Sequence, residues 1–323
     1  MKLLPKVVDT VLNGNVFATR VLSGAKRWMG ERIKCPVKYA KNTTGGAFSG
    51  FDTFATSATD NRVNLEYVPK FYKITVALPL DELSANQTEQ RVLDLASLEL
   101  QSASQDMADE IGTLFYGNGT SKEFLGLGAL IDDGTNAATI GGLSRTTYPT
   151  LKSTVTASSG VLTLAKMSTL YSAITSGAQK PTMGLCSESV FNIYEALLQA
   201  NERIVKEVPF GKGEYVSGTG FTGLYFKGFP ILSDEKATAE TLFFVNEDFI
   251  DWYALPVAMT EAVKYKAVDI KGNDYSSVMG LGFSWSGWIK PTNSASIVSH
   301  IYLGGELTTS NPKRHGKLTG ITS

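Results

Sequence analysis

Residues 88–116 read TEQRVLDLASLELQSASQDMADEIGTLFY, and apolar side chains recur there at every third or fourth position. The recurring side chains are Val92, Ala96, Leu100, Ala103, Met107, Ile111 and Leu114. This spacing predicts one long amphipathic helix, and Gly117-Asn118-Gly119 is expected to end it. At about 1.5 Å per residue the helix would be a rod of roughly 43 Å. Its narrow apolar stripe favours a strut over the wall of a substrate pocket.

Two strand-like stretches precede this helix. Residues 31–41 alternate between apolar and mostly basic side chains, which predicts a strand with one buried and one basic face. Pro36 cannot donate to a ladder and therefore predicts an edge position. The second stretch, 63–80, changes parity at Pro69, which predicts a kink or bulge. We expect residues 31–80 to form one long hairpin, which is marginal alone and needs a neighbouring copy to cover it.

The sequence after the helix predicts a mixed α/β lobe. Helices are expected at about 163–176 and 187–202, with a short buried strand at 180–186 between them. Further strands are expected at 224–226, 229–232, 242–245 and 251–255, and over most of 261–303. Residues 1–30 are expected to form a partly ordered arm, because Gly14 breaks an early apolar repeat. The order of elements predicts an α+β protein.

The charges are divided between two blocks of opposite sign. Residues 1–41 hold nine Lys and Arg against two acids, a net charge of +7, whereas residues 81–133 hold eleven acids against two cations, a net charge of −9. Such blocks are consistent with contact between them, within one chain or between chains. Two independent solvated faces would give the same pattern, and both interpretations remain open.

The bulk composition is that of a globular protein. Of the 323 residues 43% are hydrophobic and 19% are charged, which is enough to bury a core in one large domain or two intertwined domains. No run of about 18 apolar residues is present, and residues 1–20 lack the pattern of a secretory signal. Cys35 and Cys186 are distant from one another, which fits a reducing cytoplasm and provides no zinc spacing. The net charge of −1 does not point to tight binding of nucleic acid.

No constellation of catalytic or metal-binding residues emerges from the sequence. His300 is expected to be a packed or rim residue, and His315 to be solvated among the cations of a polar tail. Asp132-Asp133 and Glu188 resemble paired carboxylates only in residue type. We expect a solvated turn at the former and an acid in the first turn of a helix at the latter. We therefore predict no catalytic residue, no cofactor site and no metal site.

Two short segments, together with the order of elements, resemble the major capsid proteins of tailed bacteriophages with the Hong Kong 97 shell fold. Residues 140–149, IGGLSRTTYP, are similar to the Gly-x-x-Arg-Ser/Thr-Thr-Tyr-Pro segment of that family. Residues 311–321, NPKRHGKLTGI, are similar to an Asn-Pro-basic-x-Gly-x-Leu-x-Gly-Ile ending. Leu151-Lys152 departs from the tryptophans that many relatives have after the first segment. The resemblance covers nearly the whole chain.

The resemblance implies an organisation for the chain. It would comprise an N-terminal arm (1–30), an extended E-loop hairpin (31–80), a P-domain with a spine helix (81–134, helix about 88–116), an A-domain (135–255), P-domain strands (256–300) and a C-terminal segment (301–323). It implies a structural subunit, not an enzyme, that assembles into hexamers and pentamers of an icosahedral shell around double-stranded DNA. The shell would be the virion capsid, assembled in the cytoplasm of a host bacterium. An encapsulin-type nanocompartment and an enzyme with a carboxylate site are the alternatives.

The resemblance also implies contacts between copies, because the E-loop of this family lies on the P-domain of an adjacent subunit. The candidate contact residues are Lys34, Lys38, Lys41, Phe48, Phe51, Phe54, Arg62, Glu99, Asp106, Asp109 and Glu110. The expected partners are other copies of the chain, a separate scaffolding protein, a portal and, as a further option, a decoration protein. Contact with packaged DNA would be weak and sequence-independent, through cations of the arm. No cofactor and no membrane partner are expected.

Overall fold

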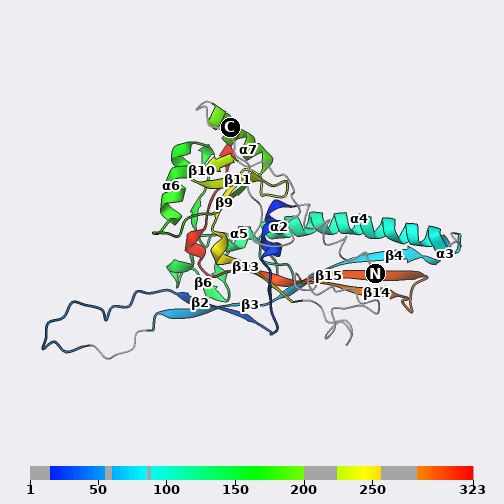
Figure 1. The fold of residues 1–323 in the computed structure, drawn as a ribbon, viewed down its shortest axis with the longest axis horizontal. Helices are drawn as coiled ribbons and strands as arrows, with labels where there is room; N and C mark the ends of the chain where they lie inside the picture. The colour runs from blue at the N-terminus through cyan, green and yellow to red at the C-terminus, as the bar shows by residue number, and fades with distance from the viewer. Residues whose placement is uncertain (1–14, 55–59, 86–88, 200–223, 256–281, 323) are drawn as a thin grey trace.

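The computed structural model describes residues 15–54, 60–85, 89–199, 224–255 and 282–322 (Figure 1). The expectations for residues 1–14, and for strands between 256 and 281, lie outside the described residues. The described part contains a sheet with a long helix beside it, a mixed lobe and a hairpin that extends away from both (Figure 1). The predicted α+β class is confirmed.

The first sheet has five strands and lies alongside the long helix. Its order is β1 (Lys26–Arg27), β13 (Ile250–Ala254), β15 (Ser296–Thr309) and β14 (Phe283–Ile289), with β4 (Lys70–Pro79) also paired to β15. Helix α4 spans Glu89–Tyr116, which confirms the predicted helix. Leu100, Met107 and Ile111 of its apolar stripe are buried. Beyond that stripe, the ring of Phe115 lies 5.4 Å from the ring of Trp252 on β13 and fixes the helix end to the sheet.

The second sheet forms the centre of the mixed lobe. Its six strands follow the order β10 (Leu224–Phe226), β11 (Phe229–Ser233), β9 (Met183–Cys186), β12 (Leu242–Val245), β16 (Gly316–Leu318) and β7 (Thr154–Thr156). Helices α6 (Leu164–Ile174) and α7 (Glu188–Gln199) pack against it. The Thr163 side chain accepts a hydrogen bond from the Lys166 N–H and caps α6. The predicted helices, and the strand between them, are confirmed.

Short elements complete the described structure. They are α3 (Leu80–Ala85), α5 (Leu127–Leu130), the paired strands β5 (Thr139–Ile140) and β6 (Leu143–Ser144), the paired strands β8 (Gly160–Val161) and β17 (Ile321–Thr322), and the 3-10 turns η1 (Pro149–Leu151), η2 (Glu247–Phe249) and η3 (Pro312–Arg314). Glu188 lies in the first turn of α7, as predicted. His300 is half-buried on β15, with its Nδ1 2.9 Å from the Thr75 hydroxyl, which confirms a packed rim residue.

The predicted single hairpin over 31–80 is wrong in its second half. Strands β2 (Ile33–Lys38) and β3 (Arg62–Tyr67) do form a two-stranded ladder, so Pro36 lies at an edge, as predicted. After β3, however, the chain leaves this ladder at Pro69, and β4 pairs with β15 over ten residues of the first sheet. The parity change is the cause, since it turns the apolar side chains of β4 toward the α4 side of that sheet.

The apolar face of the hairpin base is buried in its own copy. Ile33, Cys35 and Val37 of β2 and Leu65 and Tyr67 of β3 belong to the main hydrophobic cluster. The Glu66 N–H also donates to the Gly141 carbonyl, 2.9 Å away, in the turn between β5 and β6. The expectation that the whole hairpin needs a neighbour to cover it is therefore wrong for its base. Only the stretch beyond the base remains uncovered by the described residues.

The described part of the predicted arm is also ordered. Helix α2 (Val16–Ser23) packs against the first sheet and α4, and the Phe17 ring lies 5.9 Å from the ring of Phe115. The Asn15 amide donates to the Ala108 carbonyl at 2.7 Å and fixes the start of α2 to α4. The segment expected to be a partly ordered arm is thus ordered from this residue onward and packs against the body, because α2 has a large apolar face to bury.

Most of the polar tail is buried, although Lys313 is exposed. His315 is fully buried, which corrects the expectation of a solvated side chain. Its Nδ1 accepts the Asn246 N–H at 3.2 Å, and its Nε2 lies 3.2 Å from the Thr309 hydroxyl. Burial lowers the pKa of His315 to about 3. The side chain is therefore a neutral member of the core at ordinary pH.

Acid is expected to destabilise the fold through His315. Between its unfolded pKa of 6.5 and its folded pKa of about 3, the unfolded chain binds the proton and the folded chain does not. The free energy of unfolding therefore falls as the pH is lowered through this window. The His315→Gln variant, which does not titrate, is expected to lose less stability over the same range in urea unfolding. Equal slopes for the two proteins would contradict the prediction.

Candidate functional site

The stretch between β2 and β3 carries an uncovered apolar cluster. Beyond the hairpin base the chain runs far from the body of the molecule (Figure 1). Phe48, Phe51 and Phe54, the phenylalanine cluster, are 69%, 107% and 67% exposed. The rings of Phe48 and Phe54 lie 5.2 Å apart. Three exposed aromatic side chains on one projecting segment are typical of a contact surface.

The basic candidates lie on the exposed side of the same hairpin. Lys38, Lys41 and Arg62 are exposed and have no ion pair within the part of the chain that the structure describes. Lys34 differs, because its Nζ lies 3.4 Å from Glu66 on β3. Arg32 lies closer to the same carboxylate, at 2.8 Å, and its hydrogen bond holds the pKa of Glu66 below the usual value.

The acidic candidates lie on α4, away from the hairpin. Asp106 and Glu110 are exposed, and Glu99 is half-buried. Asp109 already forms an ion pair with Lys236 of the same copy. The hairpin and α4 extend in opposite directions (Figure 1). A single copy therefore does not bring the basic and acidic candidates together.

Asp132, Arg145 and Lys317 form a buried charge network that the sequence did not predict. Asp132 is fully buried, which corrects the expected solvated turn at this residue. Its carboxylate accepts the N–H groups of Gly134, Asn136 and Ala137 at 2.9, 3.0 and 2.9 Å. The Lys317 ammonium lies 3.5 Å away. Burial alone would raise the pKa of Asp132, but these N–H groups and Lys317 hold it below its usual value.

Arg145 completes this network. Its guanidinium is buried and donates to the carbonyls of Asp132, Ala129 and Leu130. Arg145 belongs to the segment 140–149 and Lys317 to the segment 311–321, so the two segments that carried the sequence resemblance meet at Asp132. The network joins the start of the lobe to β16, which lies between β12 and the edge strand β7. Only these motifs indicated it in the sequence, since neither spacing nor periodicity relates residues so far apart.

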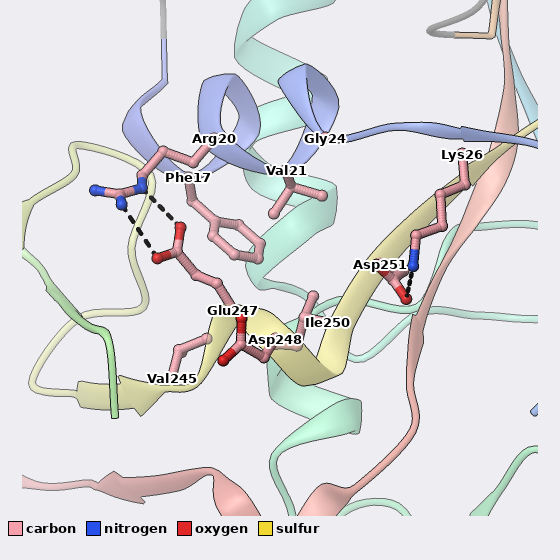
Figure 2. A pocket seen from close by; sticks show the side chains of 10 residues that line it. All are labelled: Phe17, Arg20, Val21, Gly24, Lys26, Val245, Glu247, Asp248, Ile250 and Asp251. Carbon is pink, nitrogen blue, oxygen red and sulfur yellow. Dashed lines mark hydrogen bonds and ion pairs between the residues drawn. The ribbon is translucent and has the colours of Figure 1, made fainter. Parts of the chain in front are cut away.

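Two cations of the predicted arm have acidic partners in their own copy. A hollow of about 360 Å³ lies between α2 and the η2–β13 segment. Figure 2 shows the side chains that line it. Arg20 lies 2.8 Å from Glu247 and Lys26 lies 2.7 Å from Asp251 at this hollow (Figure 2). These pairs weaken the expectation that Arg20 and Lys26 reach DNA. They also keep Glu247 and Asp251 from acting as a free carboxylate pair.

Neither a metal centre nor a membrane segment is found in the described residues. No group of three His, Cys, Asp or Glu side chains there could hold a metal ion. No helix of that part is both long and apolar enough to cross a membrane. The candidate contact surfaces among the described residues are therefore the phenylalanine cluster, the basic side chains of the hairpin and the acidic side chains of α4.

No family model and no curated protein matches the sequence. Solved structures do match the fold. The capsid of cyanophage A-1(L) has a TM-score of 0.69 at 16% identity, over 95% of this chain and 93% of that one. The chain has the Hong Kong 97 shell fold. The fold implied by the resemblance is thereby confirmed.

Other shells with the Hong Kong 97 fold are similar as well. The capsid of Myoviridae phage XM1 has a TM-score of 0.53 at 12% identity, over 94% of this chain and 92% of that one. The holo-SrpI encapsulin complex of Synechococcus elongatus PCC 7942 has a TM-score of 0.57 at 10% identity, over 93% and 85%. Because the sequence identities are this low, the similarity establishes the Hong Kong 97 fold and nothing further.

Proposed function

We propose that the chain is the structural subunit of an icosahedral phage capsid, which assembles into hexamers and pentamers around double-stranded DNA. The observation that carries the proposal is the phenylalanine cluster on a projecting segment that none of the described residues covers. Fully burying such side chains stabilises a contact by about 1.5–3 kcal/mol each. A second copy of the chain is the natural cover, because every copy presents both the cluster and the surfaces of the body. The phage capsids of the same fold support this choice.

The parts of the chain take their roles from this proposal. Residues 33–67 would be the E-loop, which is shorter than the expected 31–80 because β4 belongs to the first sheet. Helix α4 and the first sheet would form the P-domain, with α4 as its stiff spine. The mixed lobe around the second sheet would be the A-domain, which gathers at the five-fold and six-fold positions.

The contact between copies would combine apolar burial with charge. Lys38, Lys41 and Arg62 of one hairpin would face Asp106 and Glu110 on α4 of the next copy. Exposed ion pairs contribute only about 0–1 kcal/mol each. They would therefore set register and orientation, while the phenylalanine cluster would supply most of the stability. Lys34 and Asp109 would contribute less, since each already has a partner in its own copy.

Charge reversal at Lys38 and Lys41 tests this contact. The Lys38→Glu, Lys41→Glu variant is expected to assemble more slowly at low salt and to reverse the salt dependence of assembly, because salt would then screen repulsion from Asp106 and Glu110 in place of attraction. Light scattering at low and high salt measures both effects. Lys152→Glu, at another exposed cation, is the matched control and should behave as the unmodified chain does. Unchanged assembly and salt dependence in the double variant would contradict the proposed contact.

An encapsulin-type compartment is the second candidate, because the SrpI encapsulin complex has the same fold. The contents of the particles discriminate between the two. A phage shell formed during infection contains double-stranded DNA, whereas a nanocompartment contains protein cargo. The ratio of nucleic acid to protein in purified particles therefore decides between them.

The proposed role is structural and not enzymatic. Glu306 is the one carboxylate among the described residues whose pKa is clearly raised, and it faces Lys70 and backbone N–H groups, not a second acid. A separate scaffolding protein, a portal and a decoration protein are further proposed partners, with assembly in the host cytoplasm. Negative-stain microscopy of the purified chain, with and without a scaffolding partner, tests the proposal. A chain that stays monomeric under every condition would overturn it.

A further inference from the structure

The middle of the stretch between β2 and β3 forms a small closed turn. It belongs to residues 48–54, which read FSGFDTF. The Asp52 N–H donates to the Ser49 carbonyl at 2.9 Å, and the Asp52 carboxylate accepts the Ser49 N–H at 2.7 Å. These two hydrogen bonds run in opposite directions between the same two residues, so they close a turn with Gly50 and Phe51 at its apex.

Two rings of the phenylalanine cluster brace this turn. Phe48 and Phe54 flank it, and their rings meet edge to face, with centroids 5.2 Å apart and planes at 69°. Aromatic pairs of this geometry are favourable beyond the surface that they bury. The ring pair and the two hydrogen bonds involve only residues of the segment 48–54. The turn is therefore closed within a single copy, without contacts from the body of the molecule.

The third ring of the cluster is presented to the solvent. Phe51 is 107% exposed, whereas the two bracing rings are 69% and 67% exposed. A Cβ placed on the adjacent Gly50 would have no atom within 4 Å, so the apex of the turn is surrounded by open space. Of the three rings, Phe51 therefore gains least from the fold of one copy and has the most apolar surface left to bury against another molecule.

Asp52 keeps Phe51 at the apex. The segment is rich in small residues, with Gly45, Gly46 and Gly50 in or near the turn, and such a chain samples many backbone conformations unless it is restrained. Ordering a loop at the moment of contact weakens binding, whereas a loop that is already ordered avoids this cost. The Asp52 carboxylate can therefore favour a contact through the backbone that it restrains.

A second copy of the chain offers a surface that suits this turn. Asp52 is the one charged residue between 42 and 54, so the acidic face of α4 would repel it. On strand β4, by contrast, the apolar Phe71 and the cationic Lys73 are exposed two positions apart on one face, and β4 contains no acid. Phe51 beside a carboxylate complements Phe71 beside an ammonium.

We propose that residues 48–54 are a preformed knob that seats on β4 of a second copy, with Phe51 as the anchor of the contact and Asp52 as its positioning residue. The proposal rests on the proposed function, because the partner is another copy of the chain. Aromatic side chains at the centre of a contact typically dominate its affinity. Asp52 acts mainly as a hydrogen-bond acceptor within the turn, since an exposed charge contributes little.

Single substitutions separate these roles. Phe51→Ser is expected to prevent assembly while the turn stays ordered. Asp52→Ala is expected to disorder the turn and to raise the concentration at which assembly begins by about five- to tenfold, the effect of losing one hydrogen bond. Asp52→Asn keeps an oxygen that can accept the Ser49 N–H and should stay within about threefold of the unmodified chain. Phe71→Ser, at the proposed seat, should raise the concentration as well.

Two measurements read these variants. Light scattering over a concentration series gives the onset of assembly, and NMR relaxation of the backbone amides of residues 49–52 in the unassembled chain gives the order of the turn. Asp60→Ala is the matched control, because it removes an exposed acid of the same hairpin outside the turn. It should assemble as the unmodified chain does.

The knob is overturned if Phe51→Ser or Asp52→Ala assembles at the concentration of the unmodified chain. It is also overturned if Asp52→Asn loses as much as Asp52→Ala, since the charge and not the turn would then matter. Normal assembly of Phe71→Ser would overturn the seat on β4. A disordered turn in a chain that forms shells would overturn the knob and leave the proposed function intact. An unmodified chain that never assembles would overturn the proposed function, and the contact with it, even if the turn is ordered.

Discussion

Replacing Phe48, Phe51 and Phe54 with serine is expected to abolish assembly while leaving the subunit folded. The three side chains are 67–107% exposed, so a single copy loses little when they are removed. In a contact between copies, by contrast, their burial contributes about 1.5–3 kcal/mol each. Because every copy repeats the contact, the loss is multiplied over the shell. Electron microscopy and sedimentation measure assembly, and circular dichroism measures the fold.

The control for this variant removes apolar surface elsewhere. Met29 and Val161 are 77% and 55% exposed, and neither belongs to the hairpin. Met29→Ser and Val161→Ser are expected to assemble normally. The prediction is contradicted if the triple serine variant still forms shells, or if the control variants lose assembly to the same extent. Either result would show that the phenylalanine cluster is not the contact that holds copies together.

Asp132→Ala is expected to destabilise the folded chain by about 3–5 kcal/mol, the usual cost of removing one partner of a buried ion pair. The change leaves the Lys317 ammonium buried without its carboxylate and removes the nearby negative charge from the buried Arg145 guanidinium, whose hydrogen bond to the main-chain carbonyl of residue 132 remains. It also leaves the N–H groups of Gly134, Asn136 and Ala137 without their acceptor. Such a loss is a large fraction of the stability of a typical domain, so a lower soluble yield is expected as well. Urea unfolding measures the effect.

The neighbouring acid provides a matched control. Asp133 is half-buried, and its carboxylate accepts the N–H of Thr135 at 3.0 Å. Asp133→Ala is expected to cost no more than about 1 kcal/mol. Adding Lys317→Met to Asp132→Ala removes the stranded ammonium and should recover part of the stability. If Asp132→Ala and Asp133→Ala unfolded at the same urea concentration, the buried network would contribute no more to the stability of the fold than the turn at Asp133 beside it.

Local periodicity was sufficient for the elements whose pattern repeats over many residues. The stripe of α4 and the alternation of β2 each continue long enough to identify the element and its buried face. The pairing of strands, by contrast, could not be predicted from local patterns. The strand that pairs with β4 is β15, which lies more than 200 residues later in the sequence, and no local pattern predicts this pairing. The parity change at Pro69 predicted only a kink or bulge in a continuous strand, whereas the structure places β3 and β4 in two different sheets.

Burial of polar residues was the main source of error. His315 was predicted to be solvated because it follows two cations in a polar tail, and its burial depends on Asn246, which is remote in sequence. The burial of Lys317 likewise depends on a remote residue, Asp132. Helix α2 was missed although Val16, Phe17, Val21 and Leu22 have helical spacing and follow Asn15, a residue typical of helix starts. The contact residues remain a prediction for a simple reason. Their proposed partners belong to another copy, so one chain cannot bring them together.

The place of β16 in the second sheet has a consequence for protein synthesis. This strand comes from residues 316–318 and lies between β12 and β7, and β7 has no other neighbour in the sheet. The ribosome must therefore translate past Leu318 before the lobe can close, even though its other strands emerge earlier. Nascent chains that end before this strand would therefore carry an open lobe, with β7 separated from the rest of the sheet.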